Sequence, residues 1–303
     1  MNFETENKKV VVFGEVLFDV FPDGSTVLGG APFNVACHLK GLGAEPILVS
    51  RVGKDKLGDL VLWEMGKRGL EIKGMQKDER HPTGKVEVAI DENNEPNYVI
   101  KPEAAWDYIQ VDPYVEKVLQ DRPLFYHGTL AARSEVSEHA LGLYLKKKCP
   151  VFCDLNLRSP WWTEGKVSGL LSTTDYLKLN LSELKEIASG QKIMDPQDLA
   201  REMVSQGGYR QIIVTQGARG AFVVEEKGQV KKRKAPQIET FEDSVGAGDA
   251  FSAVMIIANI KGLDTDKALQ LAVDFAARIC SVKGAVPAGN QVYTDFLLKM
   301  EEK

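Results

Sequence analysis

Val10-Val11-Val12-Phe13 is a short run of β-branched and aromatic residues, and the repetition of such runs along the chain decides the fold. Longer segments with apolar residues at helical spacing separate one run from the next. This alternation is typical of parallel strands joined by helical crossovers, so it predicts an α/β fold whose mostly parallel sheet carries helices on both faces. The further strand runs are Ile47-Leu48-Val49, Leu124-Phe125-Tyr126, Val151-Phe152-Cys153, Tyr176-Leu177-Lys178-Leu179 and Ile212-Ile213-Val214. The expected helices span 34–42, 57–68, 135–148, 196–206 and 250–260.

Two stretches depart from this alternation and predict hairpins. The first joins 85–90 to 98–100 through a polar turn, and we expect a small β flap, or lid, built from about 15–30 and 84–108. The second joins 221–224 to 229–230, and the basic run 231–234 that follows is expected to be a solvated loop rather than an anion patch. No repeat or linker divides the sequence, so residues 1–303 are expected to form a single domain.

Composition limits what the protein can do. Of its 303 residues, 44% are apolar and 27% are charged, and a net charge of −5 offers no clustered basic face for nucleic acid. The longest strongly apolar stretch, 250–260, is far shorter than the roughly 20 residues of a membrane-spanning helix. The N-terminus is polar and lacks the apolar segment of a secretory signal. We therefore expect a cytoplasmic protein with no nucleic-acid or membrane partner.

The stretch Asp243-Ser244-Val245-Gly246-Ala247-Gly248-Asp249 carries the strongest chemical signal, because small, flexible residues run directly into an apolar helix. The start of a helix leaves backbone N–H groups free with the positive end of the helix dipole behind them, and glycine allows a phosphate to approach closely. Asp249 at this position could accept a proton from an attacking hydroxyl. The residues alone leave open a second interpretation, a glycine-rich turn with an ordinary acid in the first helical turn.

A second stretch, Gly29-Gly30-Ala31-Pro32-Phe33-Asn34, also leads into a helix. Adjacent glycines permit close approach of a ligand, and the Asn34 amide both donates and accepts hydrogen bonds. Together with Asp19, which follows the first strand, this stretch is suited to binding the hydroxyl groups of a sugar. Helix capping by Pro32 and Asn34 explains the same residues without a ligand.

These two stretches resemble the N- and C-terminal signatures of the ribokinase (PfkB) family of carbohydrate kinases, the second matching D-[ST]-x-G-A-G-D. The resemblance continues along the chain in the expected order. Gly14-Glu15-Val16-Leu17-Phe18-Asp19 is similar to the opening of fructokinases, Asn180-Leu181-Ser182-Glu183 to the N-x-x-E motif, and Thr215-Gln216-Gly217-Ala218-Arg219-Gly220 to the T-x-G-x-x-G nucleotide loop. It implies a ribokinase-like fold and ATP-dependent phosphorylation of a sugar.

The resemblance also implies roles for individual residues. Asp249 is then the general base, and the N–H groups of Gly246, Ala247 and Gly248 form an anion hole for the transferred phosphoryl group. Asn180 and Glu183 lie near the phosphates of ATP and their Mg²⁺, which Glu183 contacts through water. Thr215, Gly217 and Gly220 border the nucleotide.

Many members of the family are activated by a monovalent cation such as K⁺. The resemblance implies that backbone oxygens hold this ion, and the corresponding residues here are Asp243, Val245, Ile279, Val282 and Gly284. Ala288 stands where relatives add a serine hydroxyl, so one ligand of the family's set is missing.

The identity of the sugar rests on less. Asp154-Leu155-Asn156-Leu157-Arg158-Ser159-Pro160-Trp161-Trp162 is similar to a stretch that fructokinases share with ketodeoxygluconate kinases, and Arg158 suits either a phosphoryl group or an acidic sugar. The flap offers Lys101 but no arginine for a sugar carboxylate, which favours a neutral ketose, fructose, phosphorylated on a primary hydroxyl. Trp106 is expected to be either a wall on which the sugar stacks or core filler. The expected substrate-binding residues are Asp19, Gly29, Gly30, Asn34, Trp106 and Arg158.

Three further expectations accompany this assignment. The first alternative acceptor is 2-keto-3-deoxygluconate or another furanose or sugar acid. An alternative from another class is a sensor of sugars or nucleotides that keeps the fold without catalysis, against which the intact Asp249 argues. The exposed strands of the lid suggest a homodimer formed through this element.

Overall fold

The structure is a computed structural model of the chain, and it describes residues 8–90, 96–188 and 195–301. Within these ranges nine strands form one sheet, in the order β13-β12-β11-β10-β9-β8-β1-β4-β5. The strands are β1 (Lys9–Phe13), β4 (Glu45–Gly53), β5 (Met75–Asp78), β8 (Leu124–His127), β9 (Val151–Asp154), β10 (Tyr176–Asn180), β11 (Gln211–Thr215), β12 (Ala221–Glu225) and β13 (Val230–Arg233). All neighbours are parallel except at the edge, where β12 runs antiparallel to both β11 and β13. The predicted α/β fold with a mostly parallel sheet is confirmed.

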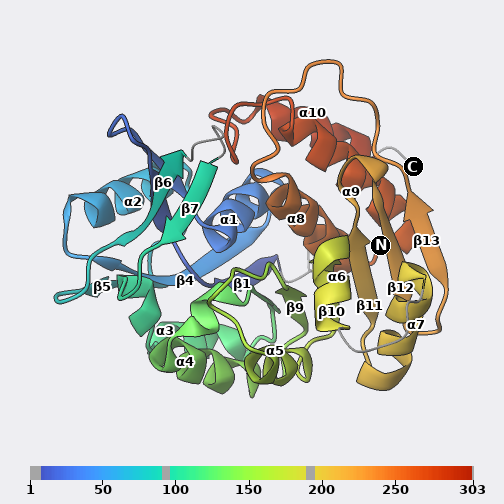
Figure 1. Cartoon of the computed structure of the whole chain (residues 1–303), viewed down its shortest axis with the longest axis horizontal. Coiled ribbons are helices and arrows are strands. Elements are labelled where there is room, and N and C mark those ends of the chain that lie inside the picture. The colour runs from blue at the N-terminus through green and yellow to red at the C-terminus, as the bar shows by residue number, and fades with distance from the viewer. Residues whose placement is uncertain (1–7, 91–95, 189–194, 302–303) are drawn as a thin grey trace.

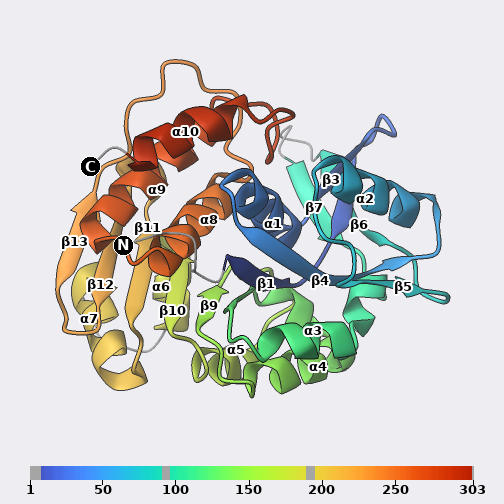
Figure 2. The same ribbon diagram turned by 180° about the vertical axis from the view of Figure 1, so that it is seen from behind.

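Helices cover both faces of this sheet (Figure 1). One face carries α1 (Ala31–Gly41), α2 (Lys56–Lys67), α8 (Ala247–Ile260), α9 (Thr265–Ile279) and α10 (Gln291–Glu301). The other carries α3 (Pro113–Leu119), α4 (Glu135–Leu145), α5 (Glu164–Leu171), α6 (Leu181–Ile187) and α7 (Pro196–Gly207). Short 3₁₀ turns η1 (Ala105–Tyr108), η2 (Leu130–Arg133) and η3 (Gly217–Arg219) complete the chain. Seen from behind, α8, α9 and α10 again lie together on one side of the sheet (Figure 2).

The central strand β1 shows why the sheet must be covered on both sides. Val11 pairs with Ile47 of β4 and with Phe125 of β8, and all three side chains belong to the core beneath α3 and α4. The neighbouring Val10 and Val12 point to the opposite core, beneath α1 and α8. Both faces of β1 are fully buried, as its uninterrupted apolar sequence predicts for a parallel strand.

A second sheet of four strands, in the order β3-β2-β6-β7, stands at the end of β1. It comprises β2 (Leu17–Val20), β3 (Thr26–Gly29), β6 (Gly84–Ile90) and β7 (Pro96–Ile100), and we call it the lid. Its strands come from the two segments expected to form the flap, and β2 and β6 pair in parallel between two antiparallel hairpins. The predicted polar turn lies at 91–95, outside the described residues.

The basic run 231–234 differs from expectation. Rather than forming a loop, it lies largely within β13, the edge strand, and Arg233 forms an ion pair with Asp266 of α9. An edge strand leaves one side of its backbone unpaired, and lysine on such a strand discourages association with further strands. The positive charges of this run are therefore explained by its place in an edge strand, where they discourage pairing with further strands.

Candidate active site

The first turn of α8 is shaped by Gly246. This residue has φ +78° and precedes the helix, and a Cβ atom built on it would lie 2.5 Å from Cα of Ala285. No side chain caps the helix, so backbone N–H groups of its first turn face outward. The N–H of Ala247 donates to the Ser244 carbonyl at 3.3 Å, so this N–H of the expected anion hole is engaged in a long bond within the turn. An apolar helix with an uncapped start is suited to receiving an anion.

Asp249 lies in that first turn and is held from α1. The Asn34 amide Nδ2 donates to Asp249 Oδ2 at 2.8 Å, which joins the two stretches that resemble the N- and C-terminal signatures of the family. Burial raises the pKa of Asp249 to about 6; the hydrogen bond from Asn34 acts in the opposite direction, Asp154 raises the pKa further, and Lys178 and Arg158 lower it. The carboxylate is thus ionised at neutral pH yet basic enough to accept a proton from a hydroxyl group.

Three of the expected sugar-binding residues are linked to this carboxylate, because Asn34 donates to it and Arg158 acts electrostatically on both Asp249 and Asp19. Asp19 lies on the lid strand β2, where burial raises its pKa and Arg158 lowers it. A Cβ at Gly29, the last residue of lid strand β3, would lie 3.6 Å from Asp19 Oδ2 on the neighbouring strand β2, and α1 begins two residues later. Gly30 has φ +107°, and a Cβ there would lie 2.6 Å from the Glu15 carbonyl oxygen. Only glycine is compatible with this approach.

Glu15 belongs to the same region, although the sequence analysis assigned it no role. Its side chain is 4% exposed and its Oε2 has no hydrogen-bond partner. Burial raises the pKa of Glu15 to about 7, Arg158 and Arg133 lower it, and Asp249 raises it. Asn34 Oδ1 and the Tyr126 hydroxyl are also buried and unpartnered. Each such atom costs about 1–3 kcal/mol when left unsatisfied, so together they suit a ligand rich in hydroxyl groups. In the sequence, only the position of Glu15 directly after the first strand indicates that it belongs to the site.

Trp106 differs from the expectation of a wall on which the sugar stacks. The residue lies in η1, beyond the lid strands, and no part of it is exposed. Its ring packs 4.0 Å from the guanidinium of Arg133, which Trp161 contacts from 4.4 Å. Arg133 also donates to both carboxylate oxygens of Asp107 at 2.7 Å. Trp106 is therefore core filler, because it has no free face to offer a ligand.

The expected nucleotide-binding residues lie at the ends of β10 and β11, where Asn180 pairs with Thr215. Asn180 caps α6 by accepting from the N–H groups of Ser182 and Glu183, and Glu183 accepts from the N–H of Asn180 at 2.8 Å. The other oxygen of Glu183 accepts from the Leu157 N–H at 2.9 Å. Gly217 begins η3 and Gly220 follows it, and both have positive φ.

This geometry bears on Mg²⁺. A carboxylate oxygen that already holds a backbone N–H keeps a lone pair for water, so the donor set of Glu183 fits a water-mediated contact with the ion. Within the described ranges there is no cluster of three or more His, Cys, Asp or Glu residues arranged to hold a metal directly.

The loops implied in binding a monovalent cation lie side by side. The N–H groups of Glu242 and Asp243 both donate to the Cys280 carbonyl, and Ala285 packs on Gly246. Asp243 Oδ1 accepts from the Val245 N–H, and the Ile279 carbonyl accepts from the Val282 N–H. Gly284 has φ +79°. The carbonyl groups of these two loops are thus close enough to share one region beside the start of α8.

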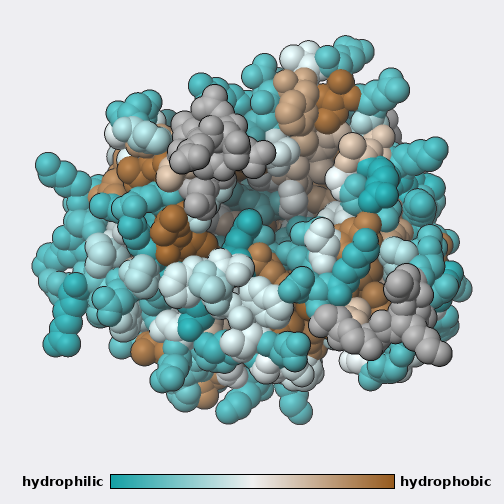
Figure 3. Space-filling view, viewed as in Figure 1, coloured by the Kyte–Doolittle hydropathy of each residue, from teal (hydrophilic) through white to brown (hydrophobic). Residues whose placement is uncertain are grey.

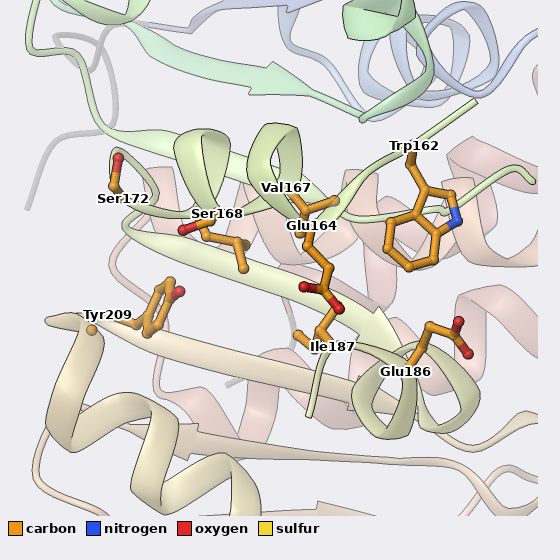
Figure 4. Close-up of a pocket in the computed structure, with 10 residues that line it drawn as sticks. Trp162, Glu164, Val167, Ser168, Ser172, Glu186, Ile187 and Tyr209 are labelled. Atoms are coloured by element: carbon orange, nitrogen blue, oxygen red, sulfur yellow. The ribbon is translucent and has the colours of Figure 1, made fainter. Parts of the chain in front are cut away.

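Open pockets lie elsewhere on the described part of the chain. A pocket of about 430 Å³ lies beside α5 and α6, with Trp162, Glu164 and Glu186 in its wall (Figure 4). Another of about 460 Å³ lies between α1, α2 and the loop before α10, where Ala288 lines it. Neither is lined by Asp249 or Asn34. The surface is hollowed near the centre of the face in Figure 3, close to where Figure 1 shows α1 and α8, and hydrophilic residues lie there.

A buried carboxylate in the first turn of a helix that no side chain caps, together with a second carboxylate on the lid, is an arrangement suited to transfer of a phosphoryl group to a hydroxyl. Residues 7–291 match the model of the pfkB family of carbohydrate kinases, and the chain belongs to this family. It is 28% identical over 314 residues to a fructokinase of Escherichia coli, with 92% of this chain and 95% of that protein covered.

Solved structures show the same fold. A fructokinase of Xylella fastidiosa with bound ATP superposes with a TM-score of 0.82 at 21% identity, covering 98% of this chain and 100% of that one. A double mutant of a fructokinase of Vibrio cholerae, bound to fructose, ADP and potassium ion, superposes with a TM-score of 0.76 at 23% identity, covering 96% of this chain and 99% of that one.

Among the described residues, no helix combines the length and apolar character needed to cross a bilayer.

Proposed function

We propose that this carbohydrate kinase transfers the γ-phosphoryl group of ATP to a primary hydroxyl of a ketose, and that the ketose is fructose. The hydrogen bond of 2.8 Å between Asn34 and Asp249 carries the proposal. It joins the stretch 29–34, which is suited to binding a sugar, to the stretch 243–249, which is suited to binding a phosphate. A sensor without activity would have no need of a buried, ionised base at this point.

In this mechanism Asp249 accepts the proton of the attacking hydroxyl as the phosphoryl group crosses to it. N–H groups at the start of α8, from Gly246, Ala247 and Gly248, stabilise the charge that develops on the transferred group. Asn180 and Glu183 would hold the phosphates and the water shell of Mg²⁺, while Thr215, Gly217 and Gly220 border the nucleotide. When bound, Mg²⁺ neutralises phosphate charge. Closure of the lid, which carries Asp19 and Gly29, over Gly30, Asn34 and Arg158 excludes water, which otherwise competes as acceptor.

The charges of the lid support a neutral acceptor over a sugar acid. The Lys101 ammonium lies 2.6 Å from the Glu87 carboxylate, so its charge is already paired. Arg158 contributes to the electrostatics of three carboxylates, Glu15, Asp19 and Asp249. A substrate carboxylate entering this region would meet three acids and one partly engaged arginine, which disfavours 2-keto-3-deoxygluconate.

Two further features belong to this proposal. A K⁺ ion is held by backbone oxygens of Asp243, Val245, Ile279, Val282 and Gly284, and it supports the geometry of the adjoining start of α8.

Two copies of the chain associate through their lids, on which the side chains of Val27 and Tyr98 are 48% and 54% exposed. Apolar side chains exposed to this degree on a short sheet are suited to contact with a second copy.

A panel of sugars tests the function. The purified protein is incubated with ATP, Mg²⁺ and each of fructose, ribose, 2-keto-3-deoxygluconate and glucose, and ADP is measured with a coupled enzyme. We expect the highest kcat/KM with fructose. A higher kcat/KM with 2-keto-3-deoxygluconate would overturn the choice of sugar, whereas ATP binding without ADP formation across the panel would favour the sensor.

A further inference from the structure

A buried ion pair lies directly beneath the first turn of α8. Lys178 Nζ on β10 donates to Asp154 Oδ2 at the end of β9 over 2.7 Å, and both side chains are less than one-tenth exposed. Ser252 Oγ, on α8, donates to the same carboxylate oxygen over 2.8 Å. We call these three residues the Lys178 cluster. It links two central strands to the helix that begins at the phosphate-binding stretch.

The cluster converges on one carbonyl group. Lys178 Nζ lies 3.3 Å and Ser252 Oγ 3.0 Å from the oxygen of Gly248, the residue before Asp249. A Cβ atom at Gly248 would lie 3.2 Å from Lys178 Nζ, so the ammonium group rests against this glycine. The orientation of the peptide group that leads to Asp249 is therefore fixed from below by a charged side chain.

Stability alone does not account for this arrangement. Removing two charges from water costs several kcal/mol for each ion, and apolar residues of similar volume often serve stability equally well or better. An ion pair in the core is better explained where it defines one orientation of a functional group. Here that group is the first turn of α8, whose N–H donors are useful only when they are aimed correctly.

We propose that Lys178 and Asp154 are positioning residues for phosphoryl transfer, which hold the first turn of α8 in its productive orientation and place opposite charges beside the Asp249 carboxylate. This inference rests on the proposed function, because it assumes that Asp249 is the base. It adds two residues whose side chains contact each other, Ser252 and the Gly248 carbonyl group.

The opposite charges give the proposal a distinctive consequence. The titratable and hydrogen-bonding groups that interact with Asp249 come from several elements: Asn34 from α1, Tyr126 from β8, Asp154 from β9, Lys178 from β10, Arg158 from the loop after β9, and Glu15 from the loop after β1. Lys178 lowers the pKa of Asp249 and Asp154 raises it. Loss of either residue breaks the same ion pair, yet the two losses move the pKa of the base in opposite directions.

The experiment compares Lys178→Met with Asp154→Asn in the full-length protein, measuring kcat and KM for ATP and fructose from pH 5 to 9. We expect kcat to fall roughly 10²-fold or more in both variants, because misaimed donors fail chiefly in the transition state. KM should change only a few-fold. The acidic limb of kcat/KM should move to higher pH in Lys178→Met and to lower pH in Asp154→Asn, by about one unit each.

Two controls keep the result interpretable. Asp78→Asn breaks the buried Arg51–Asp78 ion pair, 2.7 Å long, between β4 and β5, and should lower thermal stability without moving the acidic limb. Ser252→Ala keeps both charges, so it should lower kcat modestly and leave the acidic limb of kcat/KM in place. If the charge variants do not fold, the fall of kcat in Ser252→Ala still tests whether the cluster positions the first turn of α8. Limbs that move in the same direction, or that stay in place, overturn the inference. A wild-type protein without activity toward any sugar instead overturns the proposed function.

Discussion

Gly246 packs directly against Ala285, so that a Cβ atom at Gly246 would lie 2.6 Å from the Ala285 carbonyl oxygen. That oxygen also accepts a hydrogen bond of 3.0 Å from His38 Nε2, four residues along α1 from Asn34. The backbone at 285 is thus fixed from α1 and cannot give way to a new side chain. The start of α8, where the phosphoryl group is expected, depends on this glycine.

We therefore expect Gly246→Ala to lower kcat roughly 10²–10³-fold, the loss typical of one displaced anion-hole donor. Steady-state kinetics with ATP and fructose, together with thermal denaturation, measure the effect. Gly262→Ala is the matched control, because Gly262 has φ +61° just after the same helix but nothing within 4 Å of its Cβ position. That control should show only the cost of the left-handed backbone, about 1 kcal/mol, with near-normal kcat. Equal kcat in the two variants would argue against an anion hole at Gly246.

Much of the fold could be predicted because apolar runs such as Val10-Val11-Val12-Phe13 can be satisfied only by burial on both faces. The α9 helix was not predicted, although its apolar residues repeat at helical spacing and face α8. Val230 of β13 is predicted as part of the second hairpin, but residues 231–233 are expected to be a loop, because runs of charged residues usually lie in surface turns. The backbone pairing of β13 to β12 outweighs that weak local preference.

The residues of the candidate site also fall into those that the sequence predicts and those that it does not. Asp249, Gly246 and Asn34 could be found because each occurs in a compact stretch with its own physical reason. Lys178 lies within an apolar strand run, and a single lysine in such a run does not predict a functional role. Its role follows only from its contacts with Asp154 of β9 and Gly248 of α8. Trp106 was ambiguous, since whether an aromatic ring is exposed depends on its neighbours, here Arg133 and the residues of η1. Tertiary contacts of this kind leave no local trace in the sequence.

The pH dependence of the reaction follows from the ionisation of Asp249. A general base must be ionised to accept a proton, and the pKa of Asp249 is about 6 because the group is buried. We expect kcat/KM to fall as the pH drops through about 6. Asn34→Ala removes the hydrogen bond that lowers this pKa, so the acidic limb should move to higher pH. A limb that stays in place in Asn34→Ala would show that another group controls the reaction.

Replacement of the base itself gives the largest expected loss. Asp249→Asn keeps the size and the contact with Asn34 but cannot accept the proton, so kcat should fall about 10²–10⁴-fold. Circular dichroism and ATP binding should remain close to the wild type. Asp198→Asn, on the exposed surface of α7, is the control and should retain normal turnover. Near-native kcat in a well-folded Asp249→Asn protein would disprove the assignment.

The monovalent cation is tested by ion replacement. Backbone carbonyls of the loops around Asp243 and Ile279 are suited to a large monovalent ion, whose hydration shell such oxygens replace, so rates in K⁺ should exceed those in a bulky organic cation several-fold. Ala288→Ser introduces the hydroxyl that relatives carry, and we expect it to lower the K⁺ concentration that gives half-maximal activation. Identical rates in both buffers would exclude activation by K⁺.

Glu15 links the chemistry of the site to the stability of the fold. Its carboxyl has an ordinary pKa of 4.5 when exposed and about 7 in the folded protein, because burial disfavours its charged form. The folded state therefore loses stability as the pH rises from about 4.5 to about 7, at about 1.4 kcal/mol for each unit of difference in pKa, and less after relaxation. We expect Glu15→Gln to raise the free energy of unfolding by roughly 1–3 kcal/mol at pH 8 and by little at pH 4.5. Glu45→Gln, at an exposed position, should change neither value. Because the buried Oε2 has no hydrogen-bond partner among the described residues, we expect it to accept from a sugar hydroxyl, so the same substitution should raise KM for fructose while leaving KM for ATP unchanged. Chemical denaturation at the two pH values, beside the kinetics, decides the matter, since a purely structural glutamate would change stability without changing KM.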